Sequence, residues 1–359
     1  MTKLFLTGAT GYIGGDALCA IVKAHPEYKI TALVRNSDKG AQVAKDYARL
    51  KLVYGDLDSV DLIAEEAKKA DVVCHFADAD HAASATAIIN GLAARSTERP
   101  GFYIHTSGTG LLLFADINSK TYGEPLDKIY DDLEHVSEVT SLPDDAPHRD
   151  VDKIVLAAGS DQSERIKTAI VAPPTIYGAG RGPGNRISHQ LPELCKATLQ
   201  TGHGIKVGAG KAYWGNIHIY DLSNLYLKLV EEAAHGGSTA DWPGKPALWG
   251  AEGYYFCENG EHIWGEVSQM VADEAYKQGF MKTKEVVSIS ASQADGLTEF
   301  GAAMWGGNSR SRARRARVAL KWTPREEGIG SAVKEALEVQ ARVLGVRPGH
   351  AEVAAGEVQ

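Results

Sequence analysis

The chain has 359 residues, of which 44% are apolar and 23% charged, and this excludes disorder because there is enough apolar material for a core. Lys and Arg number 38 against 46 for Asp and Glu, and the net charge of −8 gives no general attraction to nucleic acid or to an anionic membrane. No apolar run of about 18 residues occurs, so no segment is expected to span a membrane.

The cysteines indicate the compartment. Cys19, Cys74, Cys195 and Cys257 stand far apart with no C-x-x-C pair, which is typical neither of a disulfide framework nor of a thiolate zinc site. The first residues carry no signal-peptide pattern. We therefore expect a cytoplasmic protein with a small-molecule substrate, no metal, and no nucleic-acid or membrane partner. If the chain is oligomeric, a homodimer is expected, because dimers are the commonest soluble oligomers.

The first half of the chain alternates short apolar runs with helix-length segments. Strands are expected at residues 4–7, 30–34, 52–54, 72–76, 102–106 and 168–172, and helices at 14–24, 58–70 and 82–94. Strands with continuous, β-branched apolar residues that are separated by helices indicate βαβ units around a buried parallel sheet. The fold class is therefore predicted as α/β, with a Rossmann-type doubly wound parallel sheet.

After residue 178 this alternation weakens. A glycine-rich loop at 178–186 is followed by an expected helix at 187–201, a strand near 217–220, a helix at 222–234 and turns at 236–246. Mixed helices with a short strand are expected over 254–344. We predict a dinucleotide-binding domain at 1–178 with a return segment at about 212–236. A smaller mixed α/β substrate domain occupies mainly 179–345, and a flexible tail 346–359.

The strongest motif is Thr-Gly-Ala-Thr-Gly-Tyr-Ile-Gly at 7–14, placed between the first strand and the first helix. In such a loop, Gly8 permits the sharp turn, Gly11 lets a pyrophosphate approach the backbone, and Gly14 lets the helix pack close to the strand. The start of the helix then offers unpaired N–H groups to the phosphates. A simple glycine-rich turn is the alternative, but the context predicts dinucleotide binding.

The end of the second strand bears on the choice of dinucleotide. An NAD site usually carries Asp or Glu there, to hold the ribose 2′-hydroxyl, whereas this sequence has Arg35. A guanidinium suits a 2′-phosphate, which it can bind through two parallel hydrogen bonds. We therefore predict NADP as cofactor, with NAD as the alternative if Arg35 is only a solvated residue at a strand end.

Seven short segments in chain order carry a family resemblance. They are T-G-A-T-G-Y-I-G at 7–14, G-D-L at 55–57, H-F-A at 75–77, I-H-T-S at 104–107, P-P-T-I-Y-G at 173–178, N-I-H-I-Y-D-L at 216–222 and L-K-W-T-P at 320–324. Together they resemble the extended short-chain dehydrogenase/reductase superfamily, which includes nucleotide-sugar epimerases and dehydratases. The resemblance implies cofactor contacts from Gly8, Thr10, Gly11, Tyr12, Ile13, Gly14, Asp56, Leu57, Phe76, Ala77, Thr106, Lys153, Pro173, Thr175 and Ile176.

The same resemblance implies a catalytic Tyr-x-x-x-Lys pair and a hydroxyl residue. Lys153 aligns with the family lysine, which holds the ribose and lowers the pKa of the tyrosine. The tyrosine position, however, is Arg149, a permanent cation that cannot donate a proton near neutral pH. Ser107 and Thr109 both lie near the position of the hydroxyl residue.

Another residue would then have to move the proton. His148 precedes Arg149 and has a suitable ordinary pKa, which makes it our candidate. Tyr122 and Tyr130, in the loop after the fifth strand, are weaker candidates. For each of the three, a surface or packing role is the alternative.

Asp78, Asp80 and His81 follow the fourth strand at the edge where ligands bind in such sheets. Their spacing is compatible with a metal site, but one loop is weak support for it. We predict instead that Asp78 or Asp80 caps the helix at 82–94.

Residues beyond the glycine-rich loop are candidates for substrate binding. Asn185, Arg186 and Gln190 are placed to face a polar substrate, and Trp214 to wall its pocket. Arg310 belongs to the densest basic run, 308–317, and arginine suits a diphosphate. A solvated helix face or an oligomer contact is the alternative for this run.

Three functions follow from these patterns. The first is an NADP(H)-dependent oxidoreductase of the extended or atypical short-chain dehydrogenase type, acting on a small carbonyl or secondary-alcohol substrate. The second is a non-catalytic NAD(P)-binding protein that senses redox state, which Arg149 at the tyrosine position favours. The third is a nucleotide-sugar epimerase or dehydratase, against which the same Arg149 counts.

Overall fold

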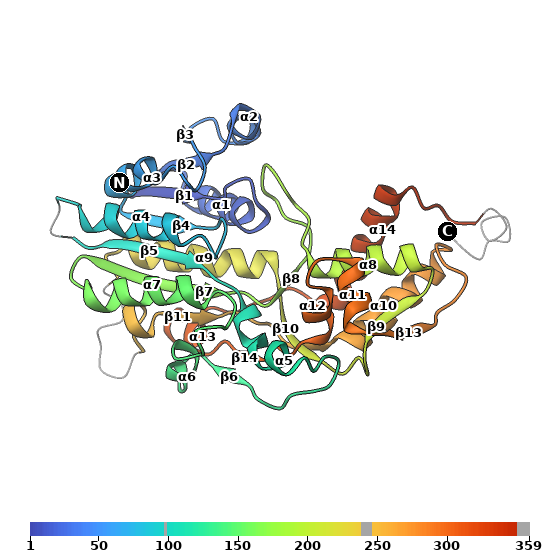
Figure 1. Ribbon diagram of the computed structural model, residues 1–359. Coiled ribbons are helices and arrows are strands. Elements are labelled where there is room, and N and C mark those ends of the chain that lie inside the picture. The colour runs from blue at the N-terminus through green and yellow to red at the C-terminus, as the bar shows by residue number, and fades with distance from the viewer. Residues whose placement is uncertain (97–98, 238–245, 350–359) are drawn as a thin grey trace.

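The computed structural model describes residues 1–96, 99–237 and 246–349. Its largest element is a seven-stranded sheet in the order β11-β7-β5-β4-β1-β2-β3, in which every neighbouring pair is parallel (Figure 1). The strands are β1 (Lys3–Thr7), β2 (Lys29–Val34), β3 (Lys51–Tyr54), β4 (Val72–His75), β5 (Gly101–Thr106), β7 (Ile166–Ala172) and β11 (Tyr254–Phe256).

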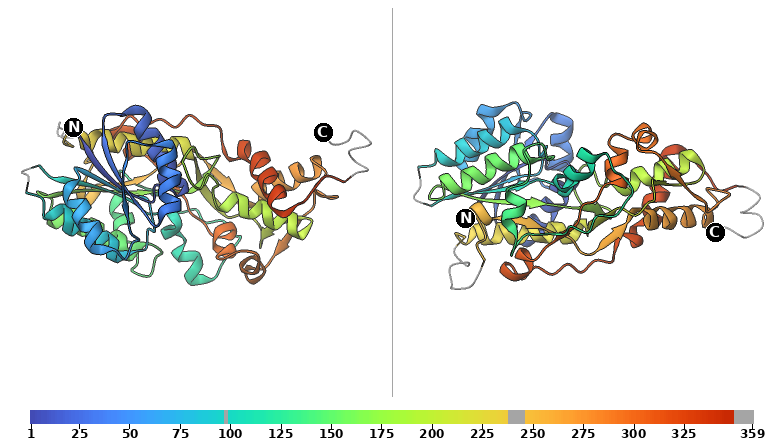
Figure 2. Two further views of the ribbon diagram at one scale, coloured as in Figure 1. Left: turned by 90° about the horizontal axis from the view of Figure 1, so that it is seen from above. Right: turned by 60° about the horizontal axis from the view of Figure 1, so that its bottom comes forward.

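Helices cover both faces of this sheet (Figure 2). The helices α3 (Val60–Lys69), α4 (Ala82–Ala93) and α7 (Arg149–Asp161) contact one another in sequence on one face, and α1 (Tyr12–Ala24) and α9 (Ile219–Ala234) contact each other on the opposite face. Helix α2 (Ser37–Asp46) lies by β2 and β3. The predicted doubly wound parallel sheet is confirmed. The strand order reverses direction at β1 and β4, and ligands bind in such sheets outside the carboxyl ends of the strands at that point.

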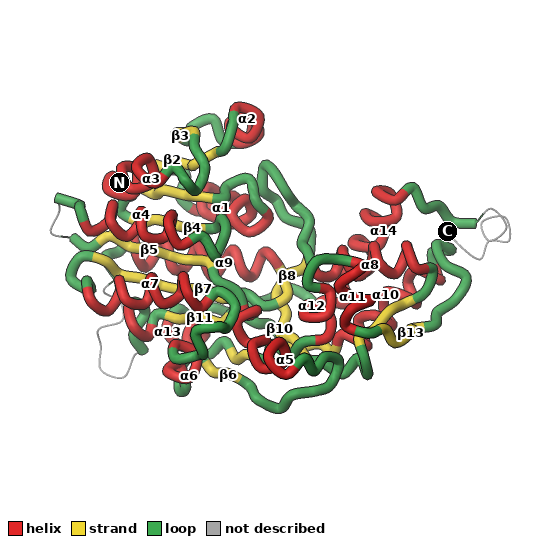
Figure 3. The backbone as a smooth tube through the Cα atoms, viewed as in Figure 1, coloured by secondary structure: helices red, strands yellow, loops and turns green. Residues whose placement is uncertain are grey.

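A second apolar core is built from smaller elements, on the right in Figure 3. Its helices are α8 (Gln190–Thr201), α10 (Trp264–Lys277), α11 (Ala291–Leu297), α12 (Gly301–Gly306) and α14 (Val333–Leu344), and its strands are β9 (Gly204–Val207) and β13 (Val286–Ile289). A three-stranded sheet of β12 (Glu261–Ile263), β10 (Tyr213–His218) and β8 (Thr175–Tyr177) lies between the two cores.

The remaining elements are short. They are η1 (Thr109–Leu113), α5 (Phe114–Ser119), β6 (Tyr130–Asp131), α6 (Val136–Thr140), η3 (Gly250–Glu252), β14 (Ser311–Arg312), α13 (Arg315–Ala319) and η4 (Ile329–Ala332). Strand β14 pairs with β6 and so joins a late segment of the chain to the loop that follows β5.

The core around the large sheet also draws on segments that come late in the chain. Buried apolar residues within 217–233, 254–257 and 313–322 belong to it. The sequence predicted one short strand within 254–344 without placing it, and the structure has four there, β11, β12, β13 and β14. Residues 238–245 of the expected turns and 350–359 of the expected tail lie outside the described residues.

All four cysteines are free thiols; Cys19 is partly exposed and the other three are buried. Within the described part of the chain, no helix combines the length and the apolar character needed to cross a bilayer.

Candidate functional site

The glycine loop between β1 and α1 forms a close backbone cradle. Gly8 has a φ of +75°, and a Cβ atom there would lie 2.7 Å from the carbonyl carbon of Phe76. A Cβ on Gly14 would collide with the carbonyl oxygen of Gly8. The helix approaches the loop this closely because both positions are glycine. Gly11 precedes the first residue of α1, and no side chain caps the helix. The first N–H groups of α1 are therefore left for a phosphate.

A cavity of about 580 Å³ opens beside this loop, a size suited to a cofactor. Its lining includes eight residues of the predicted cofactor site, namely Gly8, Thr10, Gly11, Arg35, Asp56, Leu57, Phe76 and Ala77. It also includes Lys39, Asp58, Asp78, His81 and Asn185, which the sequence did not assign to the cofactor. The glycine cradle and this lining fit a dinucleotide.

The other predicted cofactor residues have different neighbours. The Tyr12 hydroxyl donates to the Gly178 carbonyl oxygen (2.6 Å), and Thr106 shares a 2.8 Å hydrogen bond with the hydroxyl of Tyr226. Ile13 is partly buried against the large core. The Pro173 carbonyl accepts from the Thr109 N–H, Ile176 packs on the large core, and the Thr175 hydroxyl is buried without a partner.

Two cationic side chains lie at one end of the cavity, where β2 is followed by α2. The Arg35 side chain is exposed and that of Lys39 partly exposed, and both residues line the cavity. No side-chain hydrogen bond or ion pair joins either of them to another described residue. Asn36 caps α2 between them by accepting from the Lys39 N–H. This end of the cavity is therefore suited to an anionic group.

The structure distinguishes the two candidate hydroxyl residues. Thr109 Oγ1 accepts a 2.8 Å hydrogen bond from Ser309 and is completely buried, so its hydroxyl belongs to the link between η1 and the segment before β14. The Ser107 hydroxyl, just past the end of β5, is buried and has no hydrogen-bond partner. Ser107 is therefore the hydroxyl that remains available.

His148 lies against the loop that carries Ser107. It precedes α7 in a left-handed conformation with a φ of +64°, and its Nδ1 lies 2.6 Å from Oδ1 of Asp80. A Cβ atom on Gly108 or on Gly110 would lie 3.2 Å from Nε2, so these two glycines make room for the ring. The His148 side chain is 24% exposed and can still be reached by a small molecule.

The charges of this pair reinforce each other. Burial lowers the pKa of His148, but the carboxylate of Asp80 outweighs this and the pKa is raised overall. The hydrogen bond from His148 in turn lowers the pKa of Asp80.

The prediction that Asp78 or Asp80 caps α4 is wrong, because the His81 side chain accepts from the Ser84 N–H at that position. Among the described residues no group of three possible ligands is placed to hold a metal.

Lys153 and Arg149, at the start of α7, are both turned away from the cavity. The Lys153 ammonium lies 2.8 Å from the exposed carboxylate of Asp144, at the surface. The Arg149 side chain is buried and donates to the carbonyl oxygens of Leu142 (3.1 Å) and Thr140 (2.6 Å). The structure therefore does not bring Lys153 to the site where the resemblance would place it.

Of the four predicted substrate residues near α8 and β10, one lines the cofactor cavity and the other three are engaged elsewhere. Asn185 lines the cofactor cavity, and its N–H donates to the Thr10 carbonyl oxygen (2.9 Å). The Arg186 side chain donates to Gly182 of its own loop, and that of Gln190 to the Met304 carbonyl. Trp214 is buried in the second core against Trp264. The weaker proton-donor candidates are outside the cavity too, since Tyr130 pairs in β6 and Tyr122 packs on the second core.

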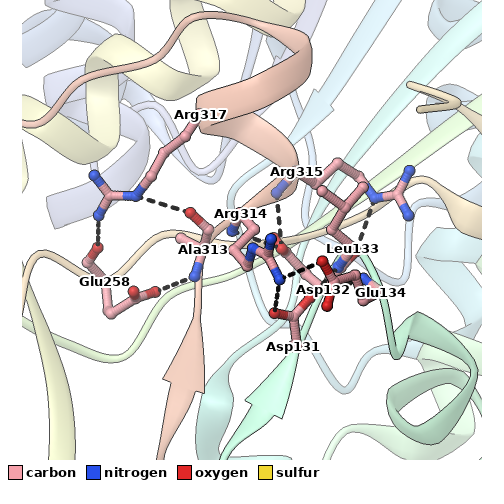
Figure 4. Close-up of polar contacts among 9 residues, drawn as sticks. All are labelled: Asp131, Asp132, Leu133, Glu134, Glu258, Ala313, Arg314, Arg315 and Arg317. Carbon is pink, nitrogen blue, oxygen red and sulfur yellow. Dashed lines mark hydrogen bonds and ion pairs between the residues drawn. The ribbon is translucent and has the colours of Figure 1, made fainter. Parts of the chain in front are cut away.

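The arginines of the basic run are paired within the chain, and Figure 4 shows the contacts of Arg314, Arg315 and Arg317. Arg310 forms two hydrogen bonds with Glu261 (2.9 and 3.2 Å), and Arg312 adds a third. Arg314 forms ion pairs with Asp131 and Glu134. Arg315 donates to the Asp132 carbonyl, and Arg317 to those of Ala313 and Glu258. Arg314 and Arg315 thus join this segment to the loop after β5. The other three arginines join it to residues 258–261.

The fold and the cavity define a class, the dinucleotide-binding proteins with a Rossmann-type sheet and a second, smaller core. Within that class the chain belongs to the NAD dependent epimerase/dehydratase family, whose model matches residues 4–242. The resemblance to extended short-chain dehydrogenases is thereby confirmed.

Individual relatives differ in their activities. The chain is 39% identical over 337 residues to oxidase ucsJ of an Acremonium species, covering 94% of this chain and 96% of that protein. It is 23% identical over 250 residues to the dTDP-glucose 4,6-dehydratase of Mycobacterium tuberculosis, covering 65% and 70%. The solved dTDP-glucose 4,6-dehydratase of Bacillus anthracis in complex with NAD has a TM-score of 0.63 at 13% identity, covering 97% and 99%. The likeness to this structure shows the fold.

Proposed function

We propose that the chain is an NADP(H)-dependent oxidoreductase that interconverts a small secondary alcohol and the corresponding carbonyl compound. The observation that carries the proposal is the 2.6 Å pair of His148 and Asp80, beside the loop of Ser107 at the carboxyl edge of the sheet. Ligands of doubly wound sheets bind at this edge. The name of the relative oxidase ucsJ, similar over 94% of the chain, agrees with redox chemistry.

In this proposal the chain's own residues hold the substrate oxygen and move its proton. His148 Nε2 accepts the proton of the alcohol in the oxidation direction and returns it in the reduction direction. Asp80 stabilises the imidazolium and fixes Nδ1 as the protonated nitrogen. The Ser107 hydroxyl holds the reacting oxygen by a hydrogen bond. When bound, the nicotinamide supplies hydride transfer.

The preference for NADP is proposed from the cations Arg35 and Lys39. Neither is paired within the described chain, and together they offer a guanidinium and an ammonium to a 2′-phosphate. Strand β2 ends at Val34 and is followed by Arg35, so the end of this strand offers no Asp or Glu side chain to the ribose 2′-hydroxyl. The neighbouring solved structure with NAD keeps NAD as the alternative cofactor.

The test measures turnover of a panel of small aldehydes, ketones and secondary alcohols, which is monitored through the absorbance of NADPH. His148→Asn is the informative variant, because asparagine tolerates the left-handed backbone but cannot act as a base near neutral pH. We expect its kcat to fall at least 100-fold. The exposed His135, replaced in the same way, is the control and keeps its activity. Undiminished turnover in His148→Asn contradicts the proposed role.

A second candidate function is a nucleotide-sugar dehydratase or epimerase, favoured by the name of the relative from Mycobacterium tuberculosis. Those substrates carry a diphosphate, for which Arg310 was the predicted ligand. Because Arg310 is held by Glu261, we place this function second. A non-catalytic redox sensor comes third, and it would bind NADPH tightly with no turnover across the whole panel.

A further inference from the structure

A buried histidine lies beneath the loop that carries Asp80. His75 is the last residue of β4 and is completely buried. Its Nε2 lies 3.2 Å from the carbonyl oxygen of Asp78, in the loop between β4 and α4. Its Nδ1 lies 2.7 Å from the hydroxyl oxygen of Thr7, which ends β1 and lines the cofactor cavity. One imidazole therefore connects the strand of the phosphate cradle to the loop that follows the neighbouring strand.

The partners of His75 determine where its ring hydrogen lies. A carbonyl oxygen only accepts hydrogen bonds, so Nε2 must carry the hydrogen that bonds to Asp78. Burial lowers the pKa of His75 to about 4, so the ring is neutral near pH 7 and Nδ1 has no hydrogen. Nδ1 therefore accepts the hydroxyl proton of Thr7. Ser84 Oγ lies farther from Nε2, at 3.5 Å, and gives its own proton to the His81 carbonyl oxygen (3.0 Å).

The hydrogen bond at Asp78 holds a turn that leads to Asp80. The Asp78 carboxylate accepts the N–H of Asp80 (3.0 Å), while the Asp78 carbonyl accepts from His75. The Asp80 carboxylate in turn lies 2.6 Å from Nδ1 of His148. Hydrogen bonds therefore lead without a gap from Thr7 in the cradle to the proposed base.

We propose that His75 is a positioning residue, which holds the turn at Asp78 and so fixes the Asp80 carboxylate against the imidazole of His148. This role rests on the proposed function of His148 as the base. The Asp80 side chain is 54% exposed, so packing alone does not keep its carboxylate in one place. Its position depends on the turn that carries it.

The first experiment examines the His75 ring and requires neither turnover nor a variant. Nitrogen NMR of histidine-labelled protein distinguishes a ring nitrogen that carries a hydrogen from one that does not. In the wild type at pH 7 we expect His75 to be neutral, with its hydrogen on Nε2. A hydrogen on Nδ1 of His75 overturns the proposed contact with Asp78.

The second experiment follows the pKa of His148 by the same NMR method in a matched pair of variants. His75→Asn keeps an acceptor for Thr7, but its side chain is too short to reach the Asp78 carbonyl. In His75→Gln the longer amide can donate to that carbonyl. We expect the pKa of His148 to fall by about 1 pH unit in His75→Asn and to stay close to the wild-type value in His75→Gln.

A double variant shows whether Asp80 transmits the effect. Asp80→Asn removes the carboxylate altogether, so it should lower the pKa of His148 further than His75→Asn does. Adding His75→Asn to Asp80→Asn should then cause no additional fall. Asp150 and Asp152 of α7 also raise this pKa, but they are present in every variant and do not affect the comparison.

The control is His262→Asn in β12. His262 is also buried, its pKa is lowered by burial, and its ring bonds to Asn216 of β10 (3.2 Å). This substitution should lower stability and leave both the pKa of His148 and kcat unchanged. In alcohol oxidation, His75→Asn should lower kcat about tenfold with an unchanged Kd for NADPH, and His75→Gln should restore most of the loss.

The outcomes separate the two proposals. An unchanged pKa of His148 in folded His75→Asn, or an equal fall in His262→Asn, overturns the positioning role even if His148→Asn is inactive. If that pKa falls in His75→Asn and is kept in His75→Gln, while His148→Asn retains full activity, the positioning role stands and the proposed base is wrong. The same NMR result without turnover on any substrate likewise supports the positioning of the pair and contradicts the proposed function.

Discussion

The guanidinium of Arg181 forms a double hydrogen bond with the carboxylate of Asp16, at 2.6 Å from Nη2 and 3.0 Å from Nε. Asp16 is completely buried in α1 and also accepts from Ser223 of α9 (2.6 Å). Arg181 belongs to the glycine-rich loop at 178–186, which packs so closely on α1 that a Cβ on Gly182 would lie 2.6 Å from Gly15. This ion pair therefore fastens that loop beside the phosphate cradle.

Replacing Arg181 tests this link. We expect Arg181→Ala to lower the free energy of unfolding by about 3 kcal/mol, because it leaves the buried Asp16 charge without its partner. Urea denaturation measures the change. Arg325→Ala, at an exposed arginine, is the control and should stay within about 0.5 kcal/mol of the wild type. Equal stability of the two variants would mean that water replaces the Arg181 guanidinium as the partner of the Asp16 carboxylate.

The cations beside α2 should decide the cofactor preference. Arg35→Ala and Lys39→Ala are each expected to weaken NADPH binding about tenfold, since each removes a charge-assisted hydrogen bond, and to leave NADH binding unchanged. Quenching of tryptophan fluorescence on titration gives both affinities. Lys45→Ala removes a cation from the same helix outside the cavity and serves as the control. An equal loss for both nucleotides would contradict the 2′-phosphate contact.

The pairing of His148 with Asp80 predicts a shift in pH dependence. Asp80 raises the pKa of His148, and the neutral imidazole is the form that accepts a proton from the alcohol. In Asp80→Asn this pKa falls, so the acid limb of kcat in alcohol oxidation should move to lower pH, while kcat on the plateau drops because the imidazolium is less stabilised. Rate profiles between pH 5 and pH 9 test this. An acid limb that stays in place would show that a different group titrates.

The paired arginines predict a response to nucleotides. Because Arg310 is bound by Glu261 and stacks on the Tyr213 ring, we expect dTDP and UDP not to compete with a carbonyl substrate at millimolar concentration. Steady-state inhibition at saturating NADPH provides the measurement. Competitive inhibition at micromolar dTDP or UDP would favour the dehydratase function instead.

The local patterns of the sequence were sufficient for much of the fold and the cofactor cradle. Apolar runs predicted six strands of the large sheet, and the spacing of Gly8, Gly11 and Gly14 predicted the turn that the structure contains. These features depend on backbone geometry within a few residues, which the chain encodes locally. Lys39 could also have been predicted as a residue of the cofactor site, since it lies in the first turn of the helix that follows Arg35.

The roles of the side chains at the candidate site were decided by the tertiary structure. His148 and Asp80 are 68 positions apart, as are Thr7 and His75, so no spacing in the sequence announces either contact. Lys153 matched a motif, yet Asp144 holds it at the surface, and the run around Arg310 met acidic partners brought by other segments. The sequence by itself determined the sheet and the phosphate cradle because periodicity and turns are local. The tertiary structure decided which charged side chains pair, because only the packing of distant segments brings carboxylates next to these cations.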